Sequence, residues 1–185
     1  MRRLLDQDPP AARERLLDLQ RQLAAEQRDL RFLIQELKPA PLSLSETDFE
    51  LATRLKELSA QIERQWGLSV VLHLEPLGGE IPVAQARDLY FLVHEALINA
   101  ARHAQATTVH VTLSGEDRQV HLTVADNGRG FPFKGRYDLA TLTALNPGPV
   151  VLKERITSLG GSLVIDSSEA GAHLHITLPL ARPGA

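Results

Sequence analysis

Leucines recur at alternating steps of three and four between residues 10 and 37, and Glu26 fills the one missing position of this stripe. Pro39 and Pro41 cannot continue a helix, so the helix is expected to end near Lys38. A seam this narrow needs a partner surface of matching width, which favours a dimeric bundle over a lone helix packed on its own domain. The seam consists of Leu16, Leu19, Leu23, Leu30, Leu33 and Leu37.

After residue 42, segments in which apolar residues recur with the spacing of a helix alternate with segments in which every second residue is apolar. They predict helices at 46–66, 83–104 and 150–159 and strands at 69–74, 107–114, 119–126, 162–167 and 172–180. The loop 115–118 joins two of these strands as a hairpin, whereas glycines and prolines break the periodicity across 127–149. This order predicts an α+β fold, a two-layer sandwich in which helices cover one face of a mixed, mostly antiparallel sheet. We expect a helical region at 1–40 and a globular domain at 42–182.

Composition narrows the classes of function. The formal net charge of -3 at pH 7 lacks the basic excess of a protein that binds nucleic acid. The absence of cysteine excludes disulfides and thiolate chemistry and suits a cytoplasmic protein. No apolar run approaches the roughly 18 residues that span a bilayer. We therefore expect no direct membrane contact from this chain, and a longer parent protein with a membrane anchor stays compatible with it.

The helix expected at 83–104 carries polar residues of several chemical types on one side. Glu95, Asn99 and the pair Arg102-His103 follow one another at helical spacing, opposite an apolar face. A carboxylate, an amide, a guanidinium and an imidazole can therefore face one cleft. Taken singly, each of them is more simply explained as part of a solvated face.

A second polar segment, Asp126-Asn127-Gly128-Arg129-Gly130-Phe131, directly follows an expected strand. By itself it is explained as a plain turn, because Asn-Gly favours turns and glycine supplies positive φ. Together with the polar helix it is far more specific. The helix resembles the N box, and residues 126–131 resemble the first glycine box, of the Bergerat-type (GHKL) ATPase domain shared by histidine kinases, Hsp90-like chaperones, type II topoisomerases and MutL-type repair proteins.

Within that superfamily the chain is most similar to sensor histidine kinases of the nitrate/nitrite and DesK-like class. The similarity rests on His94-Glu95-Ala96-Leu97, on Arg102-His103-Ala104, and on Lys153-Glu154-Arg155 running into Leu159-Gly160-Gly161. Residues 30–39 resemble the end of that class's second dimerisation helix. The resemblance covers nearly the whole chain. It implies the Bergerat sandwich preceded by a long dimerisation helix, with ATP and Mg²⁺ as ligands.

The resemblance also implies a role for individual side chains. Asn99 would offer its amide oxygen to Mg²⁺ bound with ATP, and Glu95 would be the catalytic base or the carboxylate that positions a nucleophile. Arg102 and His103 would lie near the phosphates, where positive charge or hydrogen-bond donors hold negative charge. Asp126 would accept a hydrogen bond from the amino group of adenine, which guanine replaces by a carbonyl.

Three glycines are expected to shape the nucleotide site. Gly128 and Gly130 would let the backbone approach the nucleotide closely, and Gly148 is the glycine retained from a later glycine box. In that box Pro149 stiffens the backbone, and Val151 stands where the family has a glycine. This altered box, together with an alanine at position 172 where the family has a threonine, is expected to leave nucleotide binding in place and to impair closure of the lid over the phosphates.

Two further features depart from the family pattern. Ala172 stands where the family has the threonine of a glycine-threonine pair, so a hydroxyl expected near the nucleotide is missing. The family's phosphoacceptor histidine belongs on an earlier helix, and all seven histidines of this chain lie beyond residue 40. The chain is then either a fragment of a longer kinase or a protein that cannot phosphorylate itself. Lys153 and Arg155 could reach phosphates, but on a short surface helix we expect both to be solvated.

The leading interpretation is the ATP-binding catalytic core of a two-component sensor histidine kinase, a phosphotransferase acting in a phosphorelay. It would pass the γ-phosphoryl group of ATP to a histidine outside this chain and then to a response regulator, as a homodimer through the leucine helix. The altered lid, Ala172 and the missing acceptor favour an alternative, a degenerate, non-catalytic dimerisation or regulatory module. A third interpretation, an anti-sigma-factor type serine kinase, shares the fold, but residues 30–39 argue against it.

Overall fold

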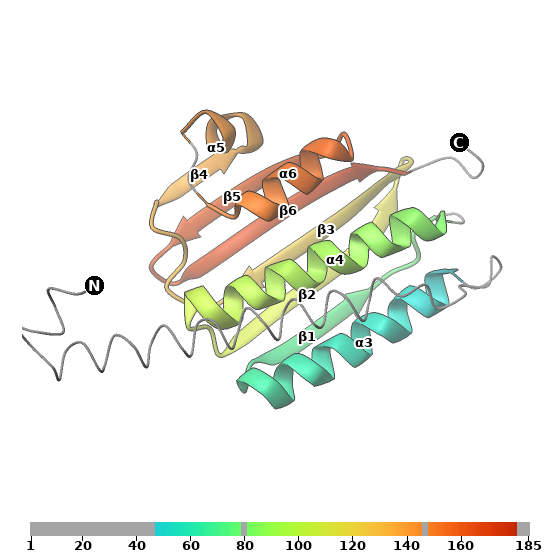
Figure 1. Cartoon of the computed structure of the whole chain (residues 1–185), viewed down its shortest axis with the longest axis horizontal. Coiled ribbons are helices and arrows are strands. Elements are labelled where there is room, and N and C mark those ends of the chain that lie inside the picture. Colours follow the sequence, from blue (N-terminus) through green and yellow to red (C-terminus); the bar gives the residue numbers. More distant parts are fainter. Residues whose placement is uncertain (1–46, 79–80, 146–147, 181–185) are drawn as a thin grey trace, which may run out of the picture. The chain divides into compact units, whose positions relative to one another are not determined.

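The computed structural model describes residues 47–78, 81–145 and 148–180 of the chain (Figure 1). The leucine helix expected at 10–38 lies outside the described residues, so the dimer seam and the domain boundary at 40–42 stay predictions. The described residues form a six-stranded sheet in the order β1-β2-β3-β6-β5-β4. Helices α3, α4 and α6 cover one face of this sheet (Figure 1). The predicted sandwich is thereby confirmed.

The bounds of the elements follow the predicted pattern closely. The strands are β1 (Ser69–Leu74), β2 (Thr108–Glu116), β3 (Gln119–Asp126), β4 (Gly135–Asp138), β5 (Ser162–Ser168) and β6 (Gly171–Pro179). The helices are α3 (Thr47–Trp66), α4 (Val83–Asn99), α5 (Leu139–Leu145) and α6 (Val150–Ser158), and a short π-helical turn, η1 (Ala100–Ala104), continues α4. Strand β1 runs parallel to β2, and the other pairs of this sheet are antiparallel.

The core lies between the sheet and these helices. Alternation along the strands turns Val109 and Val111 of β2 and Leu122 of β3 toward the helices, where they are at most 1% exposed. In the helical layer, Leu55 of α3 and Leu92 of α4 are fully buried. Burying an aliphatic side chain of this size contributes about 1.5–3 kcal/mol. This packing makes α4 a fixed support for the polar residues along its other side.

The hairpin between β2 and β3 is tighter than expected. Its strands pair as far as Glu116 with Gln119, so the turn consists of Asp117 and Arg118 alone and not of the four residues 115–118. Both turn residues have positive φ, 49° and 61°. A two-residue turn with this backbone matches the right-handed twist of the two strands.

In the segment 127–149, where glycines and prolines break the periodicity, the structure contains two elements that the sequence did not predict, β4 and α5. Their periodic signal is weak, since β4 is a short edge strand with only Tyr137 half-buried and the buried residue of α5 is Leu142. Aromatic rings order this segment. Phe131 stacks on Phe133 with 5.2 Å between ring centroids, and Phe133 lies 4.7 Å from the ring of Tyr137.

The expectation that Lys153 and Arg155 are solvated is also wrong. Lys153 is 5% exposed, and its Nζ donates a hydrogen bond of 3.0 Å to the backbone oxygen of Leu142. Arg155 donates from Nε and Nη2 to Oδ1 of Asp88, at 3.2 and 3.0 Å. The short helix packs against both α4 and α5, so these side chains have neighbours that sequence spacing does not reveal.

Burial of His94 makes stability depend on pH. This side chain of α4 is 5% exposed, and burial lowers its pKa from 6.5 to about 4. The unfolded chain therefore binds an additional proton between these values, and stability falls as the pH falls through this range. We expect a loss of about 2 kcal/mol between pH 7 and pH 5. Urea unfolding of the wild type and of His94→Gln measures it; a loss of equal size in both proteins would exclude His94 as its source.

Candidate functional site

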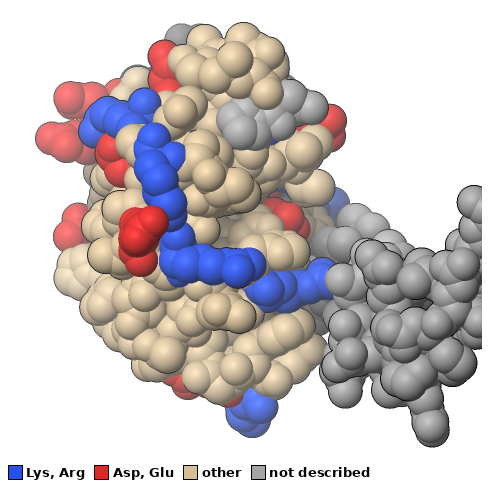
Figure 2. Space-filling view, turned by 90° about the vertical axis from the view of Figure 1, so that its left-hand side faces the viewer, with Lys and Arg blue, Asp and Glu red and all other residues tan. Residues whose placement is uncertain are grey.

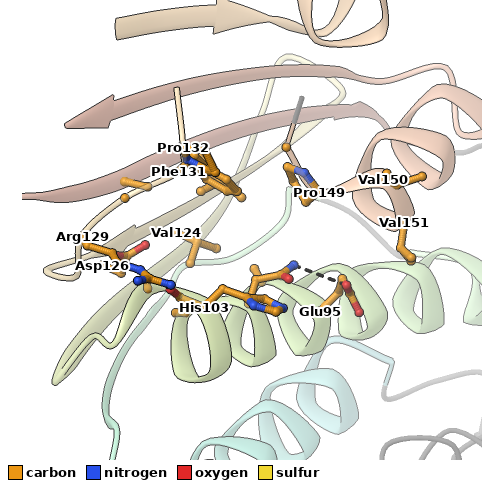
Figure 3. Close-up of a pocket in the computed structure, with 18 of the residues that line it drawn as sticks. Glu95, His103, Val124, Asp126, Arg129, Phe131, Pro132, Pro149, Val150 and Val151 are labelled. Atoms are coloured by element: carbon orange, nitrogen blue, oxygen red, sulfur yellow. Dashed lines mark hydrogen bonds between the residues drawn. The ribbon is translucent and has the colours of Figure 1, made fainter. Parts of the chain in front are cut away.

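A cavity of about 950 Å³ opens between α4 with η1 on one side and the segment 129–134 with the start of α6 on the other. Figure 3 places Asp126 and Arg129 at one end, Glu95 and Val151 at the other, and His103 between them. Of the residues predicted from sequence, Glu95, Asn99, His103, Asp126, Gly130 and Gly148 line the cavity. Arg102 and Gly128 do not line it.

Arg102 is outside the row of residues that line the cavity. Along α4 and η1 the lining residues recur at steps of four, as Glu95, Asn99 and His103 and, beside them, Ala96, Ala100 and Ala104. Arg102, three residues after Asn99, does not follow this step and does not line the cavity.

At one end of the cavity, backbone N–H groups hold the carboxylate of Asp126 in place. Its Oδ1 accepts a hydrogen bond of 2.8 Å from the N–H of Gly128, and the N–H of Ala172 donates to the same carboxylate. Burial raises the pKa of Asp126, and these two donors, followed by the charge of His173, act in the opposite direction. The result is a fixed carboxylate, 9% exposed, on the cavity wall.

The loop after Asp126 is fastened to the end of η1. The backbone N–H of Arg129 donates to the oxygen of Ala104 at 2.9 Å, and its Nε donates to the oxygen of His103 at 2.8 Å. The loop thereby satisfies carbonyls that a helix C-terminus leaves unpaired. A Cβ on Gly128 would collide with Ala104, so this glycine is required by packing within the chain; its predicted approach to a nucleotide is a separate expectation.

At the opposite end of the cavity, α4 presents two polar groups one turn apart. The amide nitrogen of Asn99 donates to Oε1 of Glu95 at 3.3 Å, the contact drawn as a dashed line in Figure 3. This bond orients the Asn99 amide and leaves its oxygen as an acceptor for a ligand or a hard cation.

The first turn of α6 forms the wall facing Glu95. The first hydrogen bond of this helix runs from the N–H of Lys153 to the oxygen of Pro149, so the N–H groups of residues 150–152 precede the helical ladder. Val150 and Val151 are 48% and 55% exposed. Backbone donors and apolar side chains therefore meet at this end, an arrangement suited to an anion that binds through main-chain N–H groups.

A band of basic side chains crosses the end of the molecule that faces the viewer in Figure 2. Lys134 donates from Nζ to the backbone oxygens of Arg129 and Ser168, at 2.7 and 2.9 Å. These acceptors are neutral, so they hold the ammonium group without cancelling its charge. Arg129 and Lys134 both line the cavity. Sequence reasoning assigned a role to neither, although Arg129 lies inside the glycine box.

The same positive charge acts on His103. Burial first, and then the charges of Arg102 and Arg129, lower the pKa of His103 below 6.5. Its imidazole is therefore neutral near pH 7 and can donate or accept a hydrogen bond inside the cavity. The cavity lining also contains the carboxylates of Glu95, Asp126 and Glu169, so an anionic ligand would depend on Arg129, Lys134 and main-chain N–H groups for favourable contacts.

Comparison with known families agrees with this geometry. Residues 84–182 match the family model described as "Histidine kinase-, DNA gyrase B-, and HSP90-like ATPase". The chain belongs to this family. Its described residues form an ATP-binding domain of the histidine kinase type, with the cavity between α4 and the segment that follows Asp126.

Several relatives of this ATPase domain are sensor kinases. The nitrate/nitrite sensor protein NarX of Escherichia coli is 30% identical over 163 residues, which cover 88% of this chain and 25% of that protein. The signal transduction histidine-protein kinase/phosphatase DegS of Brevibacillus brevis is 28% identical over 170 residues, 91% of this chain and 42% of that protein. The chain thus spans a quarter to less than half of the length of these two relatives.

Solved structures show the same fold. The blue-light activated histidine kinase of Erythrobacter litoralis EL346 matches with a TM-score of 0.56 and 24% identity over 70% of this chain and 42% of that chain. The ATP binding domain of PrrB from Mycobacterium tuberculosis matches with a TM-score of 0.50 and 21% identity, over 69% of this chain and 92% of that chain.

In the described part of the ATPase domain, no helix is long and apolar enough to cross a membrane.

Proposed function

We propose that this domain binds ATP with Mg²⁺ and transfers the γ-phosphoryl group to a histidine carried outside the chain, from which a response regulator aspartate receives it. The observation that carries the proposal is that one cavity joins a fixed carboxylate at one end to an amide, a second carboxylate and a helix N-terminus at the other. A nucleotide offers a base to the first end and phosphates to the second.

The end of the cavity that contains Asp126 would bind the nucleobase, and its geometry supports selection of adenine. Because the N–H groups of Gly128 and Ala172 hold the Asp126 carboxylate, an incoming base meets an acceptor that is already oriented. Asp126 would accept a hydrogen bond from the adenine amino group. Guanine places a carbonyl oxygen there, and two acceptors repel each other. ATP should therefore bind more tightly than GTP.

The opposite end supports phosphoryl transfer. The N–H groups at the start of α6 would hold phosphate oxygens, together with His103, which lies between the two ends of the cavity. The oxygen of Asn99 would bind Mg²⁺, which supplies positive charge to the triphosphate when present. Glu95 would accept the proton of the attacking imidazole while the new P–N bond forms and ADP leaves.

A second candidate, a regulatory module that does not turn over ATP, is favoured by the apolar start of α6. Val151 is 55% exposed beside the phosphate end, and Pro149 restricts the backbone that precedes it. Main-chain donors remain, but the chain has less freedom to close around phosphates. Under this alternative the fold and dimerisation persist without nucleotide binding.

Calorimetric titration of the chain with ATP and with GTP, both with Mg²⁺, tests the two candidates. Tighter binding of ATP supports the ATPase site, and incubation with labelled ATP and a separate histidine-bearing helical domain of a related sensor kinase then tests transfer. The absence of heat with either nucleotide would favour the regulatory module.

Homodimerisation through residues 10–38, the response regulator partner and a cytoplasmic location are further parts of this proposal.

Ala172 offers a gain-of-function prediction. Its side chain lines the cavity next to Asp126, is 1% exposed and carries no hydrogen-bonding group. We expect Ala172→Thr to bind ATP about 3- to 10-fold more tightly, because a hydroxyl at this wall adds one hydrogen bond. Ala172→Val has the same shape without the hydroxyl and is the matched control. Equal affinities of the two variants in calorimetry would show that the hydroxyl contributes nothing.

A further inference from the structure

Helices α4 and α6 supply the two walls of the phosphate end of the cavity. Glu95 and Asn99 come from α4, and residues 149–151 come from the start of α6. The distance between these helices therefore fixes the space in which phosphates would lie. What holds the two helices together is part of how this site works.

Arg155 links α6 to α4 through two kinds of contact. Its Nε and Nη2 both donate to Oδ1 of Asp88, at 3.2 and 3.0 Å. Its guanidinium carbon also lies 4.5 Å from the centroid of the Phe91 ring. A guanidinium that is paired with a carboxylate and lies over an aromatic face has little freedom to move.

The Phe91 ring that contacts Arg155 is itself held in place by packing. Phe91 is 6% exposed and packs edge-on against the ring of Tyr90, with 6.1 Å between centroids. The pair itself is shielded, because the side chains of Arg155 and Asp88 are 36% and 22% exposed. Water and salt screen such a pair less than a fully exposed one. We call the three residues Asp88, Phe91 and Arg155 the α4–α6 clamp.

The clamp lies on the same helix faces as the site. Along α4, Asp88, Phe91 and Glu95 are spaced by three and four residues, so they share one face. Along α6, Val151 and Arg155 are four residues apart and also share a face. The clamp is thus one turn away from the phosphate end on α6 and one to two turns away on α4.

We propose that Arg155 is a positioning residue that sets the spacing of α4 and α6 through Asp88 and Phe91, and thereby the affinity of the site for the phosphates of ATP. The proposal rests on the nucleotide-binding function proposed above. Arg155 acts through the helices and does not itself line the cavity. Loosening the clamp should weaken contacts to phosphates and spare contacts to the base, because Asp126 belongs to β3 and its donors lie outside α4 and α6.

Titration with two ligands separates these effects. In calorimetry with Mg²⁺, we expect Asp88→Asn and Arg155→Lys to bind ATP about tenfold more weakly, the equivalent of about 1.4 kcal/mol, and adenosine within about twofold of the wild type. Asp88→Asn keeps the side-chain shape and removes the charge, so it tests the clamp even if Arg155→Lys folds poorly. Thermal unfolding checks that each variant is folded at the titration temperature.

Arg136→Gln is the matched control. It breaks another arginine–aspartate pair with the same 3.0 Å distance, Arg136 with Asp166, which joins β4 to β5 outside the cavity lining and has side chains 69% and 38% exposed. This variant should bind both ligands as the wild type does. ATP binding unchanged in the clamp variants would overturn the proposal, and so would an equal loss for ATP and adenosine, which indicates a merely structural role. A wild type that binds neither ligand would instead overturn the proposed function, and the positioning role with it.

Discussion

Asp126→Asn should weaken ATP binding about 10- to 100-fold, because a hydrogen bond to a charged acceptor contributes about 1.5–3 kcal/mol. The backbone N–H of Gly128 would bind the amide oxygen of the new side chain, so that its NH₂ group takes the place of the other carboxylate oxygen and faces the ligand. Two NH₂ groups would then face each other when adenine binds. Guanine presents a carbonyl at that position, so the preference for ATP over GTP should shrink or reverse.

Calorimetric titration with ATP and GTP measures this change. Asp117→Asn is the control, since Asp117 lies in the β2–β3 turn with positive φ, which asparagine tolerates. The control should leave both affinities unchanged. If Asp126→Asn retained the affinity and the base preference of the wild type, Asp126 would not be the residue that recognises the base.

Gly171→Ala should destabilise the domain by about 3 kcal/mol or more. Gly171 opens β6 with a φ of 132°, and a Cβ added there would collide with the backbone oxygen of Asp126. Strands β3 and β6 pair directly at this point, where Asp126 is opposite Ala172. The collision would separate the strands or move Asp126, so the stability and the ATP affinity should fall together.

Urea unfolding of Gly171→Ala beside Gly160→Ala checks this result. Gly160 also has positive φ, 66°, but nothing lies within 4 Å of a Cβ added to it. Gly160→Ala should therefore lower the free energy of unfolding by only about 1–2 kcal/mol, because a residue with a Cβ is strained at this positive φ. Equal losses in the two variants would mean that the collision at Asp126 relaxes at no cost.

Prediction from sequence succeeded where one face of an element is continuously apolar. Helix α3 was expected at 46–66 and occupies Thr47–Trp66, and β1 was expected at 69–74 and occupies Ser69–Leu74. It failed in the segment that holds β4 and α5, where Leu142 is the buried residue of its helix and the strand lies at the edge of the sheet. Too few of these residues enter the core for their spacing to register.

The sequence by itself determined the sandwich, its family and the two polar segments, because periodic burial and short motifs are local properties of the chain. Only the tertiary structure decided which polar groups meet. Of the neighbours Arg102 and His103, His103 alone lines the cavity, and the packing of α6 on α4 makes Arg155, which was expected at the surface, a partner of Asp88. The contact of Arg155 with Asp88 joins residues 67 positions apart, and such a contact leaves no periodic pattern in the sequence.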